Sequence, residues 1–161
     1  MSKLTFLLAA LLLLCACSGP RADISAYGDT PITIVGLLDE EFTVTPNQLA
    51  ALDCINDTAR GATAKAGTVT AQGPLLDTFL AQYGKTPGDF EKIRFTASDG
   101  YVVVLKGKYL TDYQVILVLS NGDKPLSESC QPLRIVIPRA ESSMWEYAVV
   151  RIEFISAEND P

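Results

Sequence analysis

Few side chains of this sequence could do chemistry, and the cysteines come first because histidine is absent. The 161 residues contain no histidine and four cysteines, which are Cys15, Cys17, Cys54 and Cys130. The absence of histidine excludes the usual general base at neutral pH, the Ser-His-Asp and Cys-His catalytic systems, and every histidine-based metal site. The remaining chemistry therefore depends on where the cysteines, carboxylates and aromatic side chains are placed.

Two of the cysteines end an apolar segment that has the length of a signal-peptide core. Residues 4–14 are almost continuously apolar and too short to span a bilayer comfortably. The sequence LCACS at 14–18 resembles a bacterial lipobox, in which a small residue precedes the cysteine that is acylated. We therefore expect Cys17 to be lipidated. The alternative is an ordinary secretory peptide cleaved slightly later, and both interpretations place the domain outside the cytoplasm.

The other two cysteines, Cys54 and Cys130, form an even pair in an oxidising compartment. The simplest prediction is one disulfide between them, which would close a long loop and contribute up to about 4 kcal/mol in the chain-entropy account. Two separate buried thiols that behave as small hydrophobic groups are the alternative.

The elements that must position these side chains are mainly strands. Apolar residues make up 48% of the chain and charged residues 20%, with 13 Lys and Arg against 19 Asp and Glu. This composition is typical of one globular domain, and the net charge of −6 argues against a nucleic-acid partner. β-Branched and alternating patterns predict strands at 32–35, 41–45, 92–97, 101–105, 115–119, 133–137 and 147–155, with weaker signals around Thr58 and at 68–70.

Proline and glycine mark the predicted helices. Thr45-Pro46 is typical of a capped helix start, with residues 48–52 completing a short helix. A clearer helix is expected to open at Gly73-Pro74 and to stop at Gly84. Thr86-Pro87 starts a further short turn. The pattern predicts an α+β fold, a mostly antiparallel or mixed β domain with two or three short helices.

Several short motifs then follow one another in a defined order. They are Gly73-Pro74-Leu75-Leu76, the strand–turn–strand from Arg94 to Tyr101, the apolar run 115–119, Asn121-Gly122, Pro132-Leu133-Arg134, and Trp145 before a closing strand. This ordered set resembles the molybdopterin-binding domain of the sulfite-oxidase superfamily, and it looks most like the small periplasmic pterin-binding members. The resemblance covers nearly the whole chain after the leader. It implies a molybdopterin-binding-like domain at 32–155. With the lipobox-like leader, we expect a lipoprotein signal peptide at 1–16, a lipidated tether at 17–31 and a tail at 156–161.

The departures from that family bear on catalysis. In its enzymes a cysteine thiolate binds molybdenum from a strand that precedes the Gly-Pro-Leu helix. Here Cys54 lies earlier than expected, residues 58–65 contain no cysteine, and Arg60 and Lys65 stand alone where a basic run would hold the cofactor phosphate. A molybdenum centre needs a soft thiolate and a matched anion site, so we predict a non-catalytic domain without metal ligands. The alternative is a molybdopterin-dependent oxidoreductase subunit that holds the cofactor through Cys54 or Cys130.

The resemblance also implies a pocket for a reduced pterin, with no tightly bound cofactor. A pterin needs an aromatic or guanidinium face for stacking and an acceptor for its amino and ring N–H groups. The candidate ligand-binding residues are Asp99, Tyr101, Arg134, Arg139, Glu141, Ser142, Ser143 and Trp145. Three have plain structural alternatives: Trp145 as a core aromatic, Asp99 as a turn residue and Arg134 as a solvated residue. The Thr-Pro-Trp element expected before the helix in pterin-binding relatives is missing.

The family also implies partners. Its small members act with membrane-bound signalling proteins, notably diguanylate cyclases and phosphodiesterases. We therefore expect a lipid anchor and a membrane-bound cyclic-di-GMP signalling partner on the periplasmic side of a bacterial envelope. Ser18 after Cys17 resembles lipoproteins of the outer membrane. A pure protein-interaction module with a collapsed pocket is the remaining alternative.

Overall fold

A computed structural model of the chain describes residues 22–62 and 67–156. The predicted signal peptide, the lipidation site Cys17 and the last five residues lie outside the described residues. No described helix is long and apolar enough to cross a membrane.

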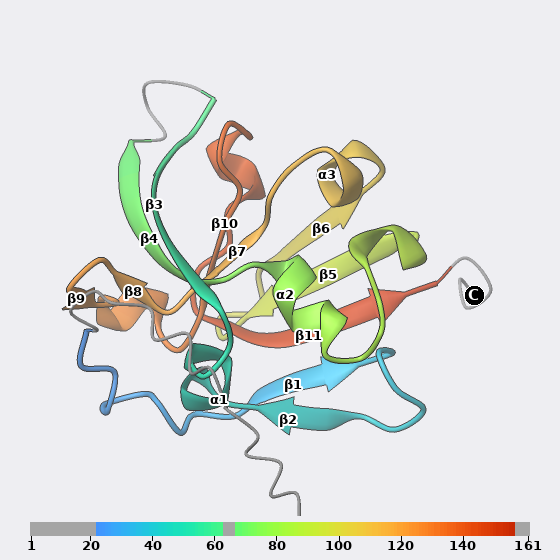
Figure 1. Cartoon of the computed structure of the whole chain (residues 1–161), viewed down its shortest axis with the longest axis horizontal. Helices are drawn as coiled ribbons and strands as arrows, with labels where there is room; N and C mark the ends of the chain where they lie inside the picture. The colour runs from blue at the N-terminus through green and yellow to red at the C-terminus, as the bar shows by residue number, and fades with distance from the viewer. Residues whose placement is uncertain (1–21, 63–66, 157–161) are drawn as a thin grey trace, which may run out of the picture.

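Within the described residues, the chain forms three sheets with short helices between them (Figure 1). The strands are β1 Ile32–Val35, β2 Phe42–Val44, β3 Cys54–Arg60, β4 Thr68–Pro74, β5 Lys92–Ala97, β6 Val102–Lys106, β7 Ile116–Val118, β8 Ser120–Asn121, β9 Lys124–Pro125, β10 Arg134–Val136 and β11 Val149–Ile155. The helices are α1 Pro46–Ala50, α2 Leu76–Ala81 and α3 Lys108–Thr111, with 3-10 turns η2 Pro87–Asp89, η3 Glu128–Cys130 and η4 Ser142–Met144. The predicted α+β class is confirmed.

The largest sheet has five strands in the order β2-β1-β11-β5-β6. The first and last strands of the fold, β1 and β11, pair in parallel, and every other neighbour in this sheet is antiparallel. Gly36 ends β1 with a φ of 72°, and a Cβ there would lie 2.1 Å from the carbonyl oxygen of Phe154. Glycine is therefore required where the chain leaves β1 beside β11.

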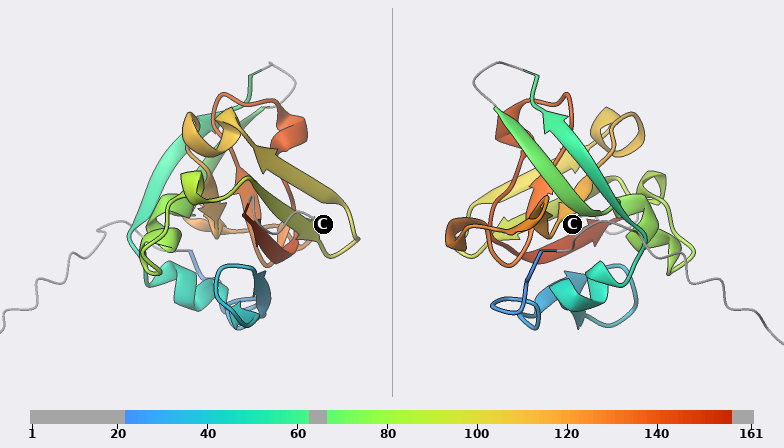
Figure 2. Two further views of the ribbon diagram at one scale, coloured as in Figure 1. Left: turned by 90° about the vertical axis from the view of Figure 1, so that its right-hand side faces the viewer. Right: turned by 60° about the vertical axis from the view of Figure 1, so that its left-hand side comes forward.

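A second sheet, in the order β3-β4-β8-β9, is built on a long antiparallel ribbon. This β3–β4 ribbon stands away from the five-stranded sheet, and α1 lies beside β1 and β2 (Figure 2). The ribbon meets the core at Gly73, where a Cβ would lie only 1.9 Å from the carbonyl oxygen of Leu117 in β7. This contact allows the Leu119 N–H to donate to the Gln72 carbonyl at 2.8 Å, which joins the ribbon to the end of β7.

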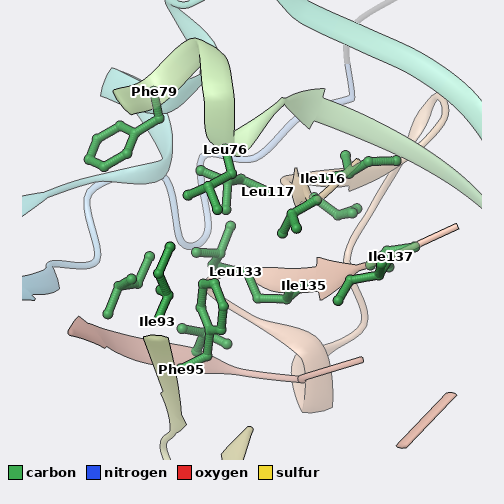
Figure 3. Packing of buried hydrophobic residues seen from close by; sticks show 14 of the residues in the cluster. Leu76, Phe79, Ile93, Phe95, Ile116, Leu117, Leu133, Ile135 and Ile137 are labelled. Carbon is green, nitrogen blue, oxygen red and sulfur yellow. The ribbon is translucent and has the colours of Figure 1, made fainter. Parts of the chain in front are cut away.

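The core lies around the antiparallel pair of β7 and β10, whose residues are all buried. Figure 3 shows Leu117 beside Leu76 of α2, with Leu133 between this pair and Phe95 of β5. These continuous apolar runs confirm the prediction of strands that are buried on both faces. Their burial explains why α2 is amphipathic, since Leu76, Phe79 and Leu80 are its buried residues.

The predicted start of the helix agrees with the structure at α1 but not at α2. The Thr45 side chain accepts from the Gln48 N–H, and the Gln48 side chain accepts from the Thr45 N–H, so the two residues form a capping box. Gly73-Pro74, expected to open the second helix, instead ends β4, and α2 begins at Leu76. The weak strand signals between residues 55 and 72 belong to full seven-residue strands, which the small polar residues of that region had masked.

Residues 22–31, expected to be part of a tether, pack on the domain. Tyr27 is 3% exposed, and its hydroxyl donates to the Leu119 carbonyl at 2.7 Å and accepts from the Leu126 N–H at 3.0 Å. One aromatic residue in a polar segment gave little pattern to detect. The packed unit thus begins before residue 32.

The predicted disulfide between Cys54 and Cys130 is not formed in the structure. The Cys54 thiol lies 3.9 Å from the carbonyl oxygens of Leu49 and Ala50 at the end of α1. Cys130 is buried in η3, where its sulfur accepts from the Ser127 hydroxyl at 3.3 Å. An even cysteine count was therefore misleading, because pairing requires that the two backbones approach each other.

Candidate functional site

The hairpin turn between β5 and β6 forms one wall of the candidate site. The Asp99 carboxylate accepts from the Tyr101 N–H at 2.9 Å, and Gly100 has a φ of 87°, so the side chain and the glycine together fix the turn. The Ser98 N–H donates to the Ala148 carbonyl at 2.9 Å. That bond holds the turn against the segment that leads into β11.

The segment between β10 and β11 forms the opposite wall. After the 3-10 turn η4, Glu146 makes a two-bond bridge with Ile135, through Ile135 N–H to Glu146 carbonyl at 2.8 Å and the reverse bond at 3.1 Å. Ala148 follows with a φ of 47°, in the left-handed region that a non-glycine residue enters at about 1–2 kcal/mol. Such strain is common beside functional sites and here turns the chain into β11.

Between these walls lies a pocket of about 340 Å³, referred to below as the hairpin pocket. This volume is at the small end of the range for ligand sites, which fits a small flat molecule. Of the residues predicted from the sequence, the pocket brings together Asp99, Tyr101, Ser142, Ser143 and Trp145. Its further lining residues are Ala97, Ser98, Ser129, Glu146, Tyr147 and Ala148.

The lining of the hairpin pocket is rich in acceptors and aromatic rings. It carries two carboxylates and four serine hydroxyls, and the described residues that line it include no lysine or arginine. Tyr101 and Tyr147 are 59% and 42% exposed, so their rings are open to a ligand. The pocket therefore favours a neutral or cationic ligand that has N–H donors and a flat face, and it disfavours a phosphate.

Glu146 is the most perturbed group of the pocket. Its side chain is 3% exposed, Oε1 accepts from the Tyr147 N–H at 2.9 Å, and Oε2 has no hydrogen-bond partner among the described residues. Burial raises the pKa of this carboxyl, the backbone bond of Tyr147 opposes that rise, and the charge of Asp99 adds to it. A buried carboxylate oxygen without a donor is one that a ligand could satisfy.

Arg134, whose plain alternative was a solvated residue, is buried at 8% exposure. Its guanidinium carbon lies 4.5 Å from the ring centroid of Tyr147 and 5.5 Å from that of Trp145, and Nη2 donates to the Tyr147 hydroxyl at 3.2 Å. These cation–π contacts stabilise a buried cation that has no ion pair with a described carboxylate. Arg134 therefore supports the pocket from behind and is not among its lining residues.

Trp145 combines both roles considered for it. It lines the hairpin pocket, yet it is only 2% exposed, and its Nε1–H donates to the Ile137 carbonyl at 2.8 Å. The ring is a core aromatic, and only a small part of it is exposed. Its face is therefore not the main stacking surface, in contrast to the sequence-based hypothesis.

The structure does not place the other two candidates at the hairpin pocket. Glu141 is exposed and is absent from the lining residues. Arg139, with a φ of 69°, lines a separate surface hollow together with Arg60 and Asp57. Both follow the buried strand β10 in sequence, but neither lines the hairpin pocket.

Cys54 lies in a different pocket of about 270 Å³, lined mainly by small residues and by Asn47, Gln72 and Ser120. From the sequence, Cys54 was expected to precede the strand that carries the molybdenum ligand in the family's enzymes. In the structure Cys54 is the first residue of β3 and lies directly opposite Pro74 of β4. Cys54 thus belongs to the strand on which a molybdenum ligand was expected.

The groups around the two cysteines do not fit a molybdenum centre with a pterin phosphate. The Cys54 sulfur lies 3.9 Å from two backbone carbonyl oxygens, which supply no positive charge for an anionic cofactor. The described residues that line its pocket include no lysine or arginine for a phosphate. Cys130 is buried and does not line the hairpin pocket, and the described residues contain no cluster of three metal-binding side chains.

Sequence reasoning missed Ser98, Ser129, Glu146, Tyr147 and Ala148 of the hairpin pocket. Glu146 precedes the alternating strand pattern and looks like a solvated acidic residue, so its burial carried no signal. Ser129 reaches the pocket because the Ala148 N–H donates to the Cys130 carbonyl at 3.3 Å, a contact between segments that are 18 residues apart. Only the neighbourhood of Trp145 could have pointed to Tyr147.

No family model and no curated protein matches this chain. Among solved structures, the sulfane dehydrogenase SoxCD from Paracoccus pantotrophus is similar, with a TM-score of 0.63 and 20% sequence identity. The match covers 82% of this chain and 40% of that chain, so this chain spans less than half of its neighbour. This likeness confirms the predicted sulfite-oxidase-like fold.

Proposed function

We propose that this domain binds a reduced pterin, or a closely similar flat heterocycle, in the hairpin pocket and that it does not catalyse a reaction. The observation that carries the proposal is an aromatic, acceptor-rich pocket with a buried carboxylate oxygen that lacks a donor. The amino-pyrimidinone edge of a pterin supplies N–H donors, and its ring supplies a face for stacking.

The charge of the pocket supports a free pterin over a phosphorylated cofactor. Asp99 and Glu146 would repel a phosphate, while no described lining residue offers a positive charge to hold one. The neutral ring of a reduced pterin avoids that repulsion. Tyr101 and Tyr147 offer it stacking contacts, each contributing about 0.5–1.5 kcal/mol beyond the area buried.

Titration of the purified chain with dimethyltetrahydropterin tests this proposal. Calorimetry should show saturable binding, and the fluorescence of the single tryptophan, Trp145, should change because this residue lines the pocket. Tyr147→Ala should weaken binding severalfold, whereas Tyr109→Ala, at a half-buried ring outside the pocket, should not. No heat and no fluorescence change at millimolar ligand would refute pterin binding and favour the interaction module.

The position of Cys54 on β3 favours one alternative, a molybdopterin-dependent oxidoreductase subunit. Metal analysis separates the two functions, because a molybdenum enzyme retains the metal on purification. We expect no molybdenum in the purified chain. Stoichiometric molybdenum that is lost in Cys54→Ser would overturn the non-catalytic proposal.

We also propose that the chain is an exported lipoprotein, anchored through Cys17 to the outer membrane on its periplasmic side, where it regulates a membrane-bound cyclic-di-GMP signalling protein. The lipobox-like sequence at 14–18 supports the anchor, and the family resemblance supports the partner. Cys17→Ser should move the protein from the membrane fraction to the soluble fraction. A variant that stays membrane-bound would refute the anchor.

A further inference from the structure

Glu146 differs from every other carboxylate of the described chain in the state of its oxygens. It is 3% exposed, and the other buried polar residues are Ser120 and Arg134. Oε1 is already held by the Tyr147 N–H, whereas Oε2 is buried without a hydrogen-bond partner among the described residues. An unsatisfied buried acceptor destabilises the domain, so its presence in a pocket calls for a functional reason.

We propose that Glu146 is the specificity-determining residue of the hairpin pocket and that it selects ligands with a 2-amino-pyrimidinone edge. This inference rests on the proposed function and names the group that reads the ligand. Asp99 is less suited to this role, because its carboxylate is exposed and already accepts from the Tyr101 N–H. Oε2 of Glu146, in contrast, has no hydrogen bond to a described residue that a ligand would have to replace.

The main chain of Glu146 is held firmly in place. Its N–H and carbonyl are both bonded to Ile135 of the fully buried strand β10, so the residue is fixed to the core. The side chain lines the pocket, and its three rotatable bonds allow a small rotation to bring Oε2 to a ligand while the main chain stays in place. A site fixed to a buried strand discriminates better than one on a loose loop.

The edge that fits this acceptor carries two adjacent donors, the 2-amino group and the neighbouring ring N–H. Pterins and guanine share this edge. Lumazine carries a carbonyl oxygen in place of the 2-amino group, and that oxygen would face the carboxylate oxygen of Glu146. Two acceptors in contact repel each other, and such a mismatch discriminates strongly in a buried site.

The test compares the affinities of the dimethyl derivatives of pterin and lumazine, which differ at position 2 and in the hydrogen on the adjacent ring nitrogen N1. It includes guanosine as a third ligand. The wild-type chain should prefer the pterin derivative at least about tenfold, as expected for a hydrogen bond to a charged group. Glu146→Gln should reduce this preference to less than about threefold, because an amide can turn either its oxygen or its nitrogen to the edge. Glu91→Gln, an exposed carboxylate outside the pocket, is the matched control and should keep the preference.

The outcomes separate the two proposals. If the wild type prefers the pterin derivative and Glu146→Gln, folded by circular dichroism, retains that preference, Glu146 is not the reader although the pocket binds pterins. If the wild type binds none of the three ligands, both proposals are overturned. Preference for guanosine over the pterin derivative would keep the role of Glu146 and replace the ligand. Glu146→Asp serves as a second variant, since it keeps the charge and should retain part of the discrimination.

Discussion

Glu146→Gln should make the free domain more stable at neutral pH, by about 1 kcal/mol. The amide can keep the 2.9 Å bond from the Tyr147 N–H through its oxygen, so no existing contact is lost. The substitution removes a negative charge from a buried atom without a partner and from the influence of Asp99. Burying an unsatisfied polar atom destabilises by about 1–3 kcal/mol, and the low end applies because the amide nitrogen inherits the same unpartnered position. For a domain of this size the gain is about 2–4 °C in Tm.

The pH dependence of this difference is the sharper measurement. The pKa of Glu146 is raised in the folded state, so the folded protein binds the proton more tightly than the unfolded chain does. The contribution of Glu146 to stability is fully present below its ordinary value of 4.5 and is lost as the pH rises through the raised folded pKa. Glutamine does not titrate, so the advantage of the variant should be absent in acid and grow toward neutral pH.

Urea denaturation followed by circular dichroism from pH 4 to pH 8 measures both effects, with Glu91→Gln as the control for loss of an exposed charge. A variant that is less stable than the wild type at neutral pH would refute the reasoning. So would an advantage that does not change with pH.

Two further predictions concern the frame around the pocket. Tyr27→Phe should destabilise the domain by about 1–3 kcal/mol, because it leaves the Leu119 carbonyl and the Leu126 N–H without their shared partner; a change below 0.5 kcal/mol in urea denaturation would show that residues 22–31 are not part of the packed unit. Gly73→Ala should prevent stable folding, because its Cβ would lie 1.9 Å from the Leu117 carbonyl oxygen; a cooperative thermal transition close to that of the wild type would contradict this.

The sequence predicted the parts of the fold that repeat a pattern. The apolar runs of β7 and β10 and the alternating pattern of β5 are recognisable in the sequence. Thr45-Pro46 is recognisable as a helix start, because threonine caps the helix and proline occupies its first turn. The β3 and β4 strands lacked a strong pattern because their small polar residues pair mainly with each other and bury little surface. The close approach of Gly73 in β4 to Leu117 in β7 is a long-range contact that no local signal shows.

The sequence predicted which segments form the candidate site, but it did not predict which part each side chain plays there. The Asp-Gly turn and the region around Trp145 do meet in one pocket. Burial separates the candidates: Arg134 lies behind the pocket, and Trp145 both lines it and belongs to the core, which was its structural alternative. Glu141 and Arg139 are not among the lining residues. Glu146 escaped notice because a carboxylate gives no sign in the sequence of being enclosed by segments distant along the chain.

The parallel pairing of β1 with β11 also governs the order in which the molecule can assemble. β1 would be an early strand in any vectorial process, yet its neighbour on that side is Val149–Ile155, the last strand of the described fold. The central five-stranded sheet therefore cannot close until nearly the entire polypeptide is available. Contacts of such large sequence separation make folding slow. Until β11 is available, β1 has only β2 as a neighbour in this sheet, and its other edge stays uncovered.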